Sequence, residues 1–135
     1  MPGEKDLGKL IASMSPGLSE TEYVFSCMAE VDYEKMVLLQ PLCTFNEEEG
    51  TTVILKRDKA DEYNIAYSGV FRCITLHVHS SLDAVGLTAA VAAKLTESNI
   101  SANVIAAFYH DHILIKSHEA DEALLALNEL VRVGL

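Results

Sequence analysis

Apolar positions in the second half of the chain follow first a period of two and then a helical period. Over residues 71–79 the side chains alternate between two faces, with Ile74, Leu76 and Val78 on one of them, which is typical of a strand. Over residues 83–99 apolar side chains recur every four positions, which predicts a helix. We expect this helix to begin at the N-cap residue Asp83 and to end at Asn99, a residue that suits the left-handed conformation found there.

Two apolar runs follow this helix, and each is predicted to be a strand. Residues 101–109 and 112–116 flank His110-Asp111, which suits a hairpin turn because aspartate tolerates the backbone conformation of turns. A last amphipathic helix is predicted over residues 117–134. Because both runs are apolar on both faces, we expect each face to be covered, by the other half of the chain or by a second subunit.

The first half of the chain gives weaker signals. Its predicted elements are a helix over 6–14, a strand over 22–28, a hairpin of 42–45 with 51–56, and a short polar helix over 57–64. The period of residues 29–40 fits neither a helix nor a strand.

The order of these elements predicts the fold class. Residues 71–132 read β-α-β-β-α, which is most of a ferredoxin-like βαββαβ unit without its last strand. The first half is interpreted as a degenerate second copy. We therefore predict an α+β fold of two ferredoxin-like units in tandem, residues 1–69 and 70–135, each with an antiparallel sheet and helices on one face.

Composition and charge exclude several function classes. The 135 residues are 50 % hydrophobic and 22 % charged, as in a globular domain, and their formal net charge is −10. This balance leaves no basic patch for a nucleic acid or an anionic membrane. The longest apolar runs are shorter than the ~20 residues of a membrane span, and the N-terminus lacks the apolar core of a signal peptide. We expect a cytoplasmic protein.

Three widely spaced cysteines complete the composition. Cys27, Cys43 and Cys73 form no CxxC pair, so a structural zinc site is not expected. We interpret all three as reduced, small apolar core residues.

One ordered string of residues carries a family resemblance. The stretch FRCITLHVHSSLDAVGLTAAVAAKLTESNISANVIAAFYHDHILI, with LIASMSPGLSETEYVF and TFNEEEGTTVIL before it, resembles the ACT-domain superfamily. More narrowly it is similar to small bacterial proteins with tandem ACT-like domains, and the resemblance covers nearly the whole chain. It implies a regulatory or sensor fold that binds free amino acids at interfaces between domains or subunits, with no cofactor.

The resemblance also implies a ligand site. The family's D-x-x-G loop corresponds to Asp83–Gly86, where a ligand carboxylate would meet the free N–H groups at the start of a helix. Gly86 would allow close approach, and Asp83 would meet the ligand ammonium. Alternatively, Asp83 is only an N-cap and Gly86 only permits tight packing. The predicted ligand-binding residues are Asp83, Ala84, Val85, Gly86, Leu87, Ser101, Asn103 and Val104.

The histidines offer a competing kind of site. His77 and His79 share one strand face at a spacing that two ligands of one metal can span, and His110, Asp111 and His112 add further donors. However, no motif places a nucleophile or a metal-binding pair. We interpret Tyr109–His112 as a structural or interface-forming hairpin corner, at the opposite end of the sheet from the D-x-x-G loop.

Three functions follow. The first is a non-enzymatic regulatory module that binds a small molecule, most simply an amino acid, and forms a homodimer or higher homo-oligomer. The alternative is a ligand-free dimerisation module of the same fold. The third is a small metal-dependent enzyme that uses the histidines.

Overall fold

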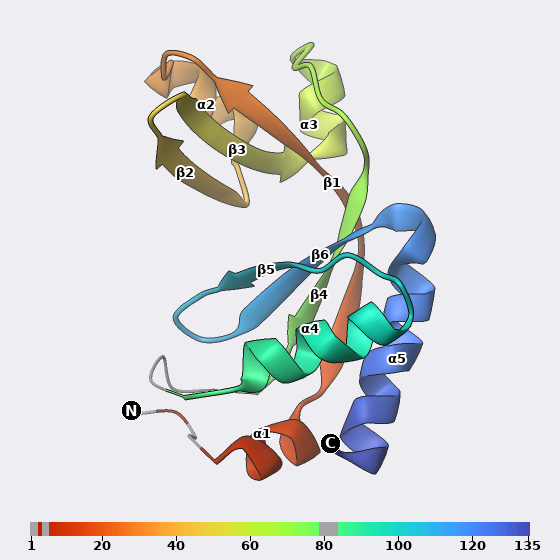
Figure 1. Cartoon of the computed structure of the whole chain (residues 1–135). Helices are drawn as coiled ribbons and strands as arrows, with labels where there is room; N and C mark the ends of the chain where they lie inside the picture. Colours follow the sequence, from red (N-terminus) through yellow and green to blue (C-terminus); the bar gives the residue numbers. More distant parts are fainter. Residues whose placement is uncertain (1–2, 4–5, 79–83) are drawn as a thin grey trace. The chain divides into compact units, whose positions relative to one another are not determined.

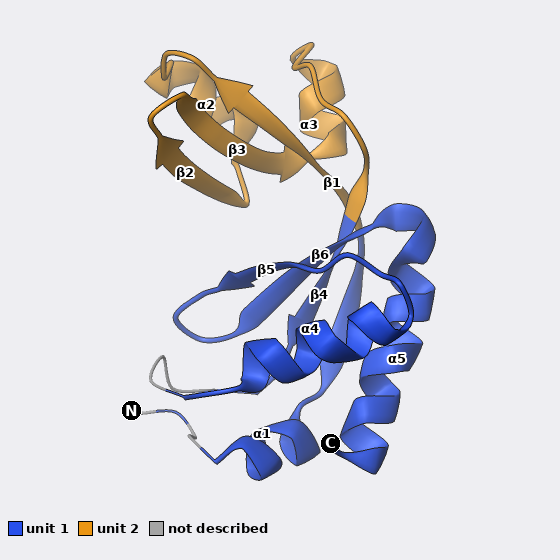
Figure 2. Ribbon diagram, in the orientation of Figure 1, with its two compact units in different colours: residues 1–20, 72–135 blue, residues 21–71 orange. Residues whose placement is uncertain are grey.

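The computed structural model describes residue 3, residues 6–78 and residues 84–135, and the fold below concerns those residues. The chain forms two compact units: unit 1 comprises residues 1–20 and 72–135, and unit 2 comprises residues 21–71 (Figure 2). The elements, labelled in Figure 1, are α1 (Leu7–Ser13), β1 (Pro16–Met28), α2 (Tyr33–Leu39), β2 (Cys43–Glu47), β3 (Gly50–Lys56), α3 (Arg57–Glu62), β4 (Phe71–Leu76), α4 (Leu87–Glu97), β5 (Asn103–Ala106), β6 (Asp111–Lys116), a 3₁₀ turn η1 (Ser117–Glu119) and α5 (Ala120–Val133).

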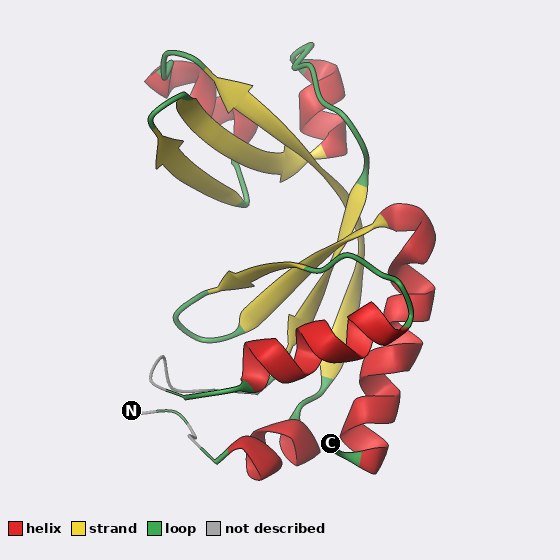
Figure 3. Cartoon of the chain, viewed as in Figure 1, coloured by secondary structure: helices red, strands yellow, loops and turns green. Residues whose placement is uncertain are grey.

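The α+β class and the predicted elements of both halves are confirmed (Figure 3). The segment that fitted no period, 29–40, contains the helix α2. Its apolar side chains lie on several sides, because Leu39 is buried whereas Tyr33 and Val37 are 77 % and 75 % exposed. That spread hides the helical period.

Two predicted details are wrong. The N-cap residue of α4 is Gly86, with φ 101°, so the helix begins later than predicted, and Asp83 itself lies outside the described residues. The turn of the last hairpin is residues 107–110, closed by a 3.1 Å hydrogen bond from Ala107 N to His110 O. Asp111 is therefore the first residue of β6, and its side chain is buried.

Unit 1 contains the strand that the sequence left missing. The sheet order is β2-β3-β1-β4-β6-β5, so the strand next to β4 is β1, whose residues 16–20 belong to unit 1. At the end of β4, His77 N donates to Ser15 O over 3.0 Å. A second hydrogen bond joins β4 to β1, because Arg72 Nε donates to Ser19 O over 2.9 Å. A β1 that begins in unit 1 and ends in unit 2 thus completes the βαββαβ pattern of unit 1.

Three helices cover one face of the unit 1 sheet. Helices α1, α4 and α5 contact one another, and their apolar sides meet the inward positions of β4 and β6. The buried residues of this core are Leu10, Ile11, Met14, Ile74, Leu76, Leu87, Ala90, Val91, Leu95, Ile100, Ile113, Ile115, Ala120, Ala123, Ala126, Leu127 and Leu130.

Unit 2 repeats the arrangement on a smaller scale. Strand β3 pairs antiparallel with β1 from Tyr23↔Lys56 to Met28↔Thr51, and with β2 from Cys43↔Ile54 to Glu47↔Gly50. Helices α2 and α3 both pack on one small core, made of Val24, Leu39, Val53, Leu55 and Ala60. The predicted boundary after residue 69 divides the chain into two successive repeats. The compact units differ from these repeats, because residues 1–20 pack in unit 1.

The cysteines have three different environments. Cys73 is buried, as predicted, and burial raises the pKa of its thiol. Cys43 is half-buried and Cys27 is exposed, so the interpretation of all three as core residues is wrong. Cys27 lies on β1 three positions after the core residue Val24, and alternation along a strand puts the two on opposite faces. Among the described residues, no helix is long and apolar enough to span a bilayer.

Candidate functional site

The predicted loop in unit 1 is built around Gly86. Its positive φ of 101° is a conformation that side-chain-bearing residues rarely adopt, and a β-carbon there would lie 3.0 Å from Leu7 Cδ2. The neighbour that limits the space at Gly86 is therefore Leu7 of helix α1, whereas the alternative interpretation of Gly86 was tight packing of a helix on the sheet. Ala84 and Leu87 contact the unit 1 core, whereas Val85 is 83 % exposed.

The start of α4 retains one property that a carboxylate ligand needs. Gly86, the N-cap residue of α4, has no side chain that could accept a hydrogen bond from the first backbone N–H groups of the helix. Uncapped N–H groups at a positive helix end favour an anion.

The second predicted group lies at the other end of α4. Ser101, Asn103 and Val104 follow the C-terminus of that 11-residue helix, which is about 16 Å long at 1.5 Å per residue. The amide of Asn103 donates to Leu114 O over 3.0 Å, and Val104 packs against the core. Exposed Ser101 lines a hollow of about 210 Å³ near Asn99. Unit 1 thus does not bring the two predicted groups together, and the predicted ligand site stays a prediction.

The histidines of unit 1 gather where β4 ends. The ring centroids of His77 and His110 are 5.5 Å apart, and those of His110 and His112 are 6.4 Å apart. His110 Nδ1 lies 3.3 Å from Val78 O, and His112 Nδ1 lies 2.9 Å from Thr75 Oγ1. We call His77, His110 and His112 the histidine cluster.

This geometry corrects the predicted position of the hairpin corner. His110 contacts His77 and Val78, which directly precede the loop that leads to α4. The corner and that loop are thus at the same end of the sheet, because β4 and β6 are neighbours and the hairpin leads into β6 beside the end of β4.

Burial changes the protonation of two groups in this corner. It raises the pKa of the Asp111 carboxyl, while the neighbouring imidazoles of His112 and His110 lower it. Burial also lowers the pKa of His112, helped by His110 and His77 and opposed by Asp111. Within the described part of the chain, no group of three or more His, Cys, Asp or Glu side chains is placed to hold a metal ion.

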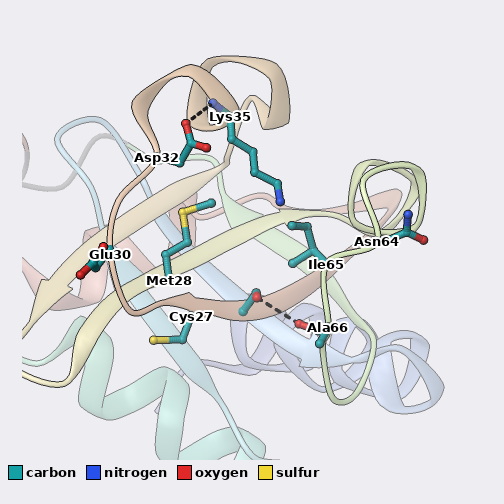
Figure 4. Close-up of a pocket in the computed structure, with 9 residues that line it drawn as sticks. Cys27, Met28, Glu30, Asp32, Lys35, Asn64, Ile65 and Ala66 are labelled. Carbon is teal, nitrogen blue, oxygen red and sulfur yellow. Dashed lines mark hydrogen bonds between the residues drawn. The ribbon is translucent and has the colours of Figure 1, made fainter.

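Unit 2 has a pocket in the position that corresponds to the loop of unit 1. It lies between the end of β1, the start of α2 and the segment after α3, and its volume is about 390 Å³. Small-molecule sites commonly have ~300–1,000 Å³. Its lining, shown in Figure 4, consists of Ser26, Cys27, Met28, Glu30, Asp32, Lys35, Asn64, Ile65 and Ala66.

Lys35 gives this pocket its charge. Asp32 caps α2 by accepting from Lys35 N over 3.0 Å, which fixes Lys35 in the first turn of the helix. From there the half-buried Lys35 side chain extends towards Ile65, whereas Glu30 points away (Figure 4). Among the described residues, no carboxylate lies within ion-pair distance of Lys35 Nζ, although the chain has 20 acidic side chains. Sequence reasoning missed Lys35 because the period of 29–40 gave no helix.

Comparison with models of protein families shows to which family the chain belongs. A model of the ACT domain matches residues 2–72, and a second ACT-domain model matches residues 69–129. The chain belongs to the ACT-domain family. ACT domains of this kind are regulatory modules, and the tandem arrangement predicted from the sequence is confirmed.

Solved structures support the same assignment. A protein of unknown function from Vibrio cholerae, described as a possible transport protein, is 46 % identical to this ACT protein, with a TM-score of 0.84 over 94 % of this chain and 97 % of that one. The ligand-free regulatory subunit of aspartate kinase from Thermus thermophilus is 9 % identical, with a TM-score of 0.64 over 88 % and 97 %. That second likeness concerns the fold alone. No match was found among curated proteins.

Proposed function

We propose that this ACT protein is a non-enzymatic regulatory module that binds a small carboxylate-bearing metabolite, most simply a free amino acid, in the unit 2 pocket. The observation that carries the proposal is Lys35, a half-buried residue that lines a 390 Å³ pocket and whose ammonium group has no acidic partner among the described residues. A carboxylate would supply that partner through a charge-assisted hydrogen bond. Asp32 at the pocket rim carries the opposite charge, which suits a ligand ammonium group.

The test is calorimetric titration with the twenty amino acids, with a chelator control for the metal hypothesis. Lys35→Gln should weaken binding of the responding amino acid by about tenfold or more, because a hydrogen bond to a charged group contributes ~1.5–3 kcal/mol. Lys9→Gln is the matched control: Lys9 holds the same position in α1, after the cap Asp6, but does not line the unit 2 pocket. An unchanged affinity in Lys35→Gln would exclude this pocket.

For unit 1, the predicted residues Asp83–Leu87 are kept as a second proposed site, supported by the N-cap residue Gly86, which has no side chain to cap the start of α4. Val85→Glu tests it without touching the packing of Gly86, because Val85 is exposed. An added carboxylate beside the helix start would repel a ligand carboxylate and lower the affinity there. Unchanged binding in Val85→Glu, together with lost binding in Lys35→Gln, would leave unit 2 as the only site.

The ligand-free alternative also has an observation in its favour. In unit 2 the helix α2 exposes three apolar side chains, those of Tyr33, Val37 and Leu38. Such a surface suits a second subunit. A flat amino-acid titration together with a melting temperature that rises with protein concentration would favour this dimerisation function. The homo-oligomer and the cytoplasmic location stay predictions.

A further inference from the structure

The histidine cluster lies on the sheet face opposite the unit 1 helices. Ile74 and Leu76 of β4 point into the helix-covered core, so alternation places Thr75 and His77 on the other face. His112 of β6 reaches the same face, because its ring meets the Thr75 hydroxyl. The cluster is therefore separate from the helix-covered core of unit 1.

The fold makes room for this cluster at Gly17. A β-carbon on Gly17 would lie 2.8 Å from Nε2 of His77, closer than such contacts occur. Gly17 does not have a positive φ, so its backbone conformation does not call for glycine. With glycine at position 17 the His77 ring can lie this close to β1, whereas a β-carbon there would make the ring shift.

Few charged groups face the three rings. On the hairpin side the carboxylate that interacts electrostatically with His110 and His112 is that of Asp111, which is buried. Alternation along β6 places Asp111 on the face of Ile113 and Ile115, opposite to His112. From β4 and β1 the neighbours are the Thr75 hydroxyl and Gly17, which carry no charge. His79 lies outside the described residues. Three imidazolium ions at these separations would repel one another with one carboxylate nearby to offset them.

We propose that the histidine cluster is an acid-sensitive contact, which holds the β5–β6 hairpin against the end of β4 when the rings are neutral and lets the hairpin open when they are protonated. Hairpin opening separates His110 and His112 from His77 and exposes His112 to water. Both changes relieve the burial and the repulsion that lower the pKa of His112, so His112 binds its proton more tightly in the open form. The lowered pKa of His112 agrees with this direction.

The test is amide hydrogen exchange of the full chain at pH 7.5 and pH 5.5, with rates corrected for their intrinsic pH dependence. Hairpin β2–β3 is an internal reference, because residues 21–71 contain no histidine. We expect protection of the β5–β6 amides to fall several-fold at pH 5.5, since each pKa unit between the closed and open forms corresponds to tenfold in opening. Protection of β2–β3 should change less than about twofold. Equal loss in both hairpins would overturn the proposal.

Variants separate the cluster from other acid effects. The double variant His110→Gln/His112→Gln should show the same β5–β6 protection at both pH values, whereas His118→Gln, which changes an exposed ring outside the cluster, should keep the wild-type fall. A double variant that keeps the full fall would contradict the proposal. If the double variant does not fold, NMR titration of the wild-type rings decides: His112 must titrate below the ordinary value of 6.5, and titration at or above it would refute the proposal.

Discussion

The two ACT units differ most in how the first strand passes into the first helix. In unit 2 four residues, 29–32, lead from β1 to α2, and Asp32 caps the helix with its own carboxylate. In unit 1 ten residues, 77–86, lead from β4 to α4, and Gly86 provides no side-chain cap. At the start of the helix, the same topology thus has a lysine side chain in one unit and a glycine N-cap in the other.

The cores differ as well, and the difference sets the scale of the expected effects. Three helices of unit 1 share 17 buried residues, whereas α2 and α3 of unit 2 share five. Around the small core lie partly buried side chains such as Met28 and Met36, which can shift into a space left by a substitution. Truncation should therefore cost more in unit 1.

The largest expected effect comes from Leu127→Ala in α5. Leu127 is fully buried in the unit 1 core, and such truncations cost about 2–5 kcal/mol because a cavity remains. Leu39→Ala in unit 2 should lie at the lower end of that range, because its neighbours can collapse. Urea denaturation gives both values. Equal costs would show that the small core is as rigid as the large one.

Three glycines with positive φ extend the comparison to the backbone. At Gly50, in unit 2, a β-carbon would meet Met28 O at 2.9 Å, whereas at Gly86 it would meet the flexible tip of Leu7 at 3.0 Å. We expect Gly50→Ala to cost about 2–3 kcal/mol and Gly86→Ala about 1–2 kcal/mol. Gly134→Ala is the control, because nothing lies within 4 Å of its added carbon and strain alone remains. If Gly50→Ala lowers the free energy of unfolding by no more than Gly134→Ala, the backbone at Met28 moves to accommodate the added carbon.

Physical reasons explain which parts of this fold could be predicted. The alternation over 71–79 identified β4 because Ile74 and Leu76 point into a core that covers one face. Helix α2 was missed because Tyr33 and Val37 break the period that burial would impose, and Lys35 was missed with it. A signal was present, since Asp32 is a good N-cap residue and precedes Lys35 by three positions.

The histidine cluster could not be predicted for a different reason. Its members come from residues 77 and 110–112, so their proximity depends on β4 lying beside β6. Element order indicated a ferredoxin-like unit, but the end of the sheet to which the hairpin corner belongs was assigned wrongly. Pairing of distant strands is the step that a periodicity within one segment does not determine.

Capping residues provide a smaller test of the two strand-to-helix connections. Asp32→Ala should destabilise the protein by about 1 kcal/mol, because it removes the hydrogen bond to Lys35 N. Asp6→Ala at the start of α1 has the same cap and the same expected cost. Gly86→Ser would add a capping hydroxyl but also strain, so no gain is expected there. Thermal denaturation measures the stability of all three variants. A higher melting temperature for Gly86→Ser would show that the missing capping side chain, and not the φ of Gly86, limits the stability of α4.

The smallest expected effect is the pH dependence of global stability. The pKa of His112 is lowered in the folded chain, so the unfolded chain binds the proton more tightly, and the free energy of unfolding should fall as the pH drops from about 7.5 to about 5.5. Asp111 has the opposite sign: its raised pKa means that the folded chain takes up a proton first at lower pH, which relieves the cost of a buried carboxylate. His112→Gln should reduce the fall in the free energy of unfolding between pH 7.5 and pH 5.5, and should leave the effect of Asp111 at lower pH unchanged. Urea denaturation at closely spaced pH values measures both, and a stability that rises between pH 7.5 and pH 5.5 would contradict the assigned direction for His112.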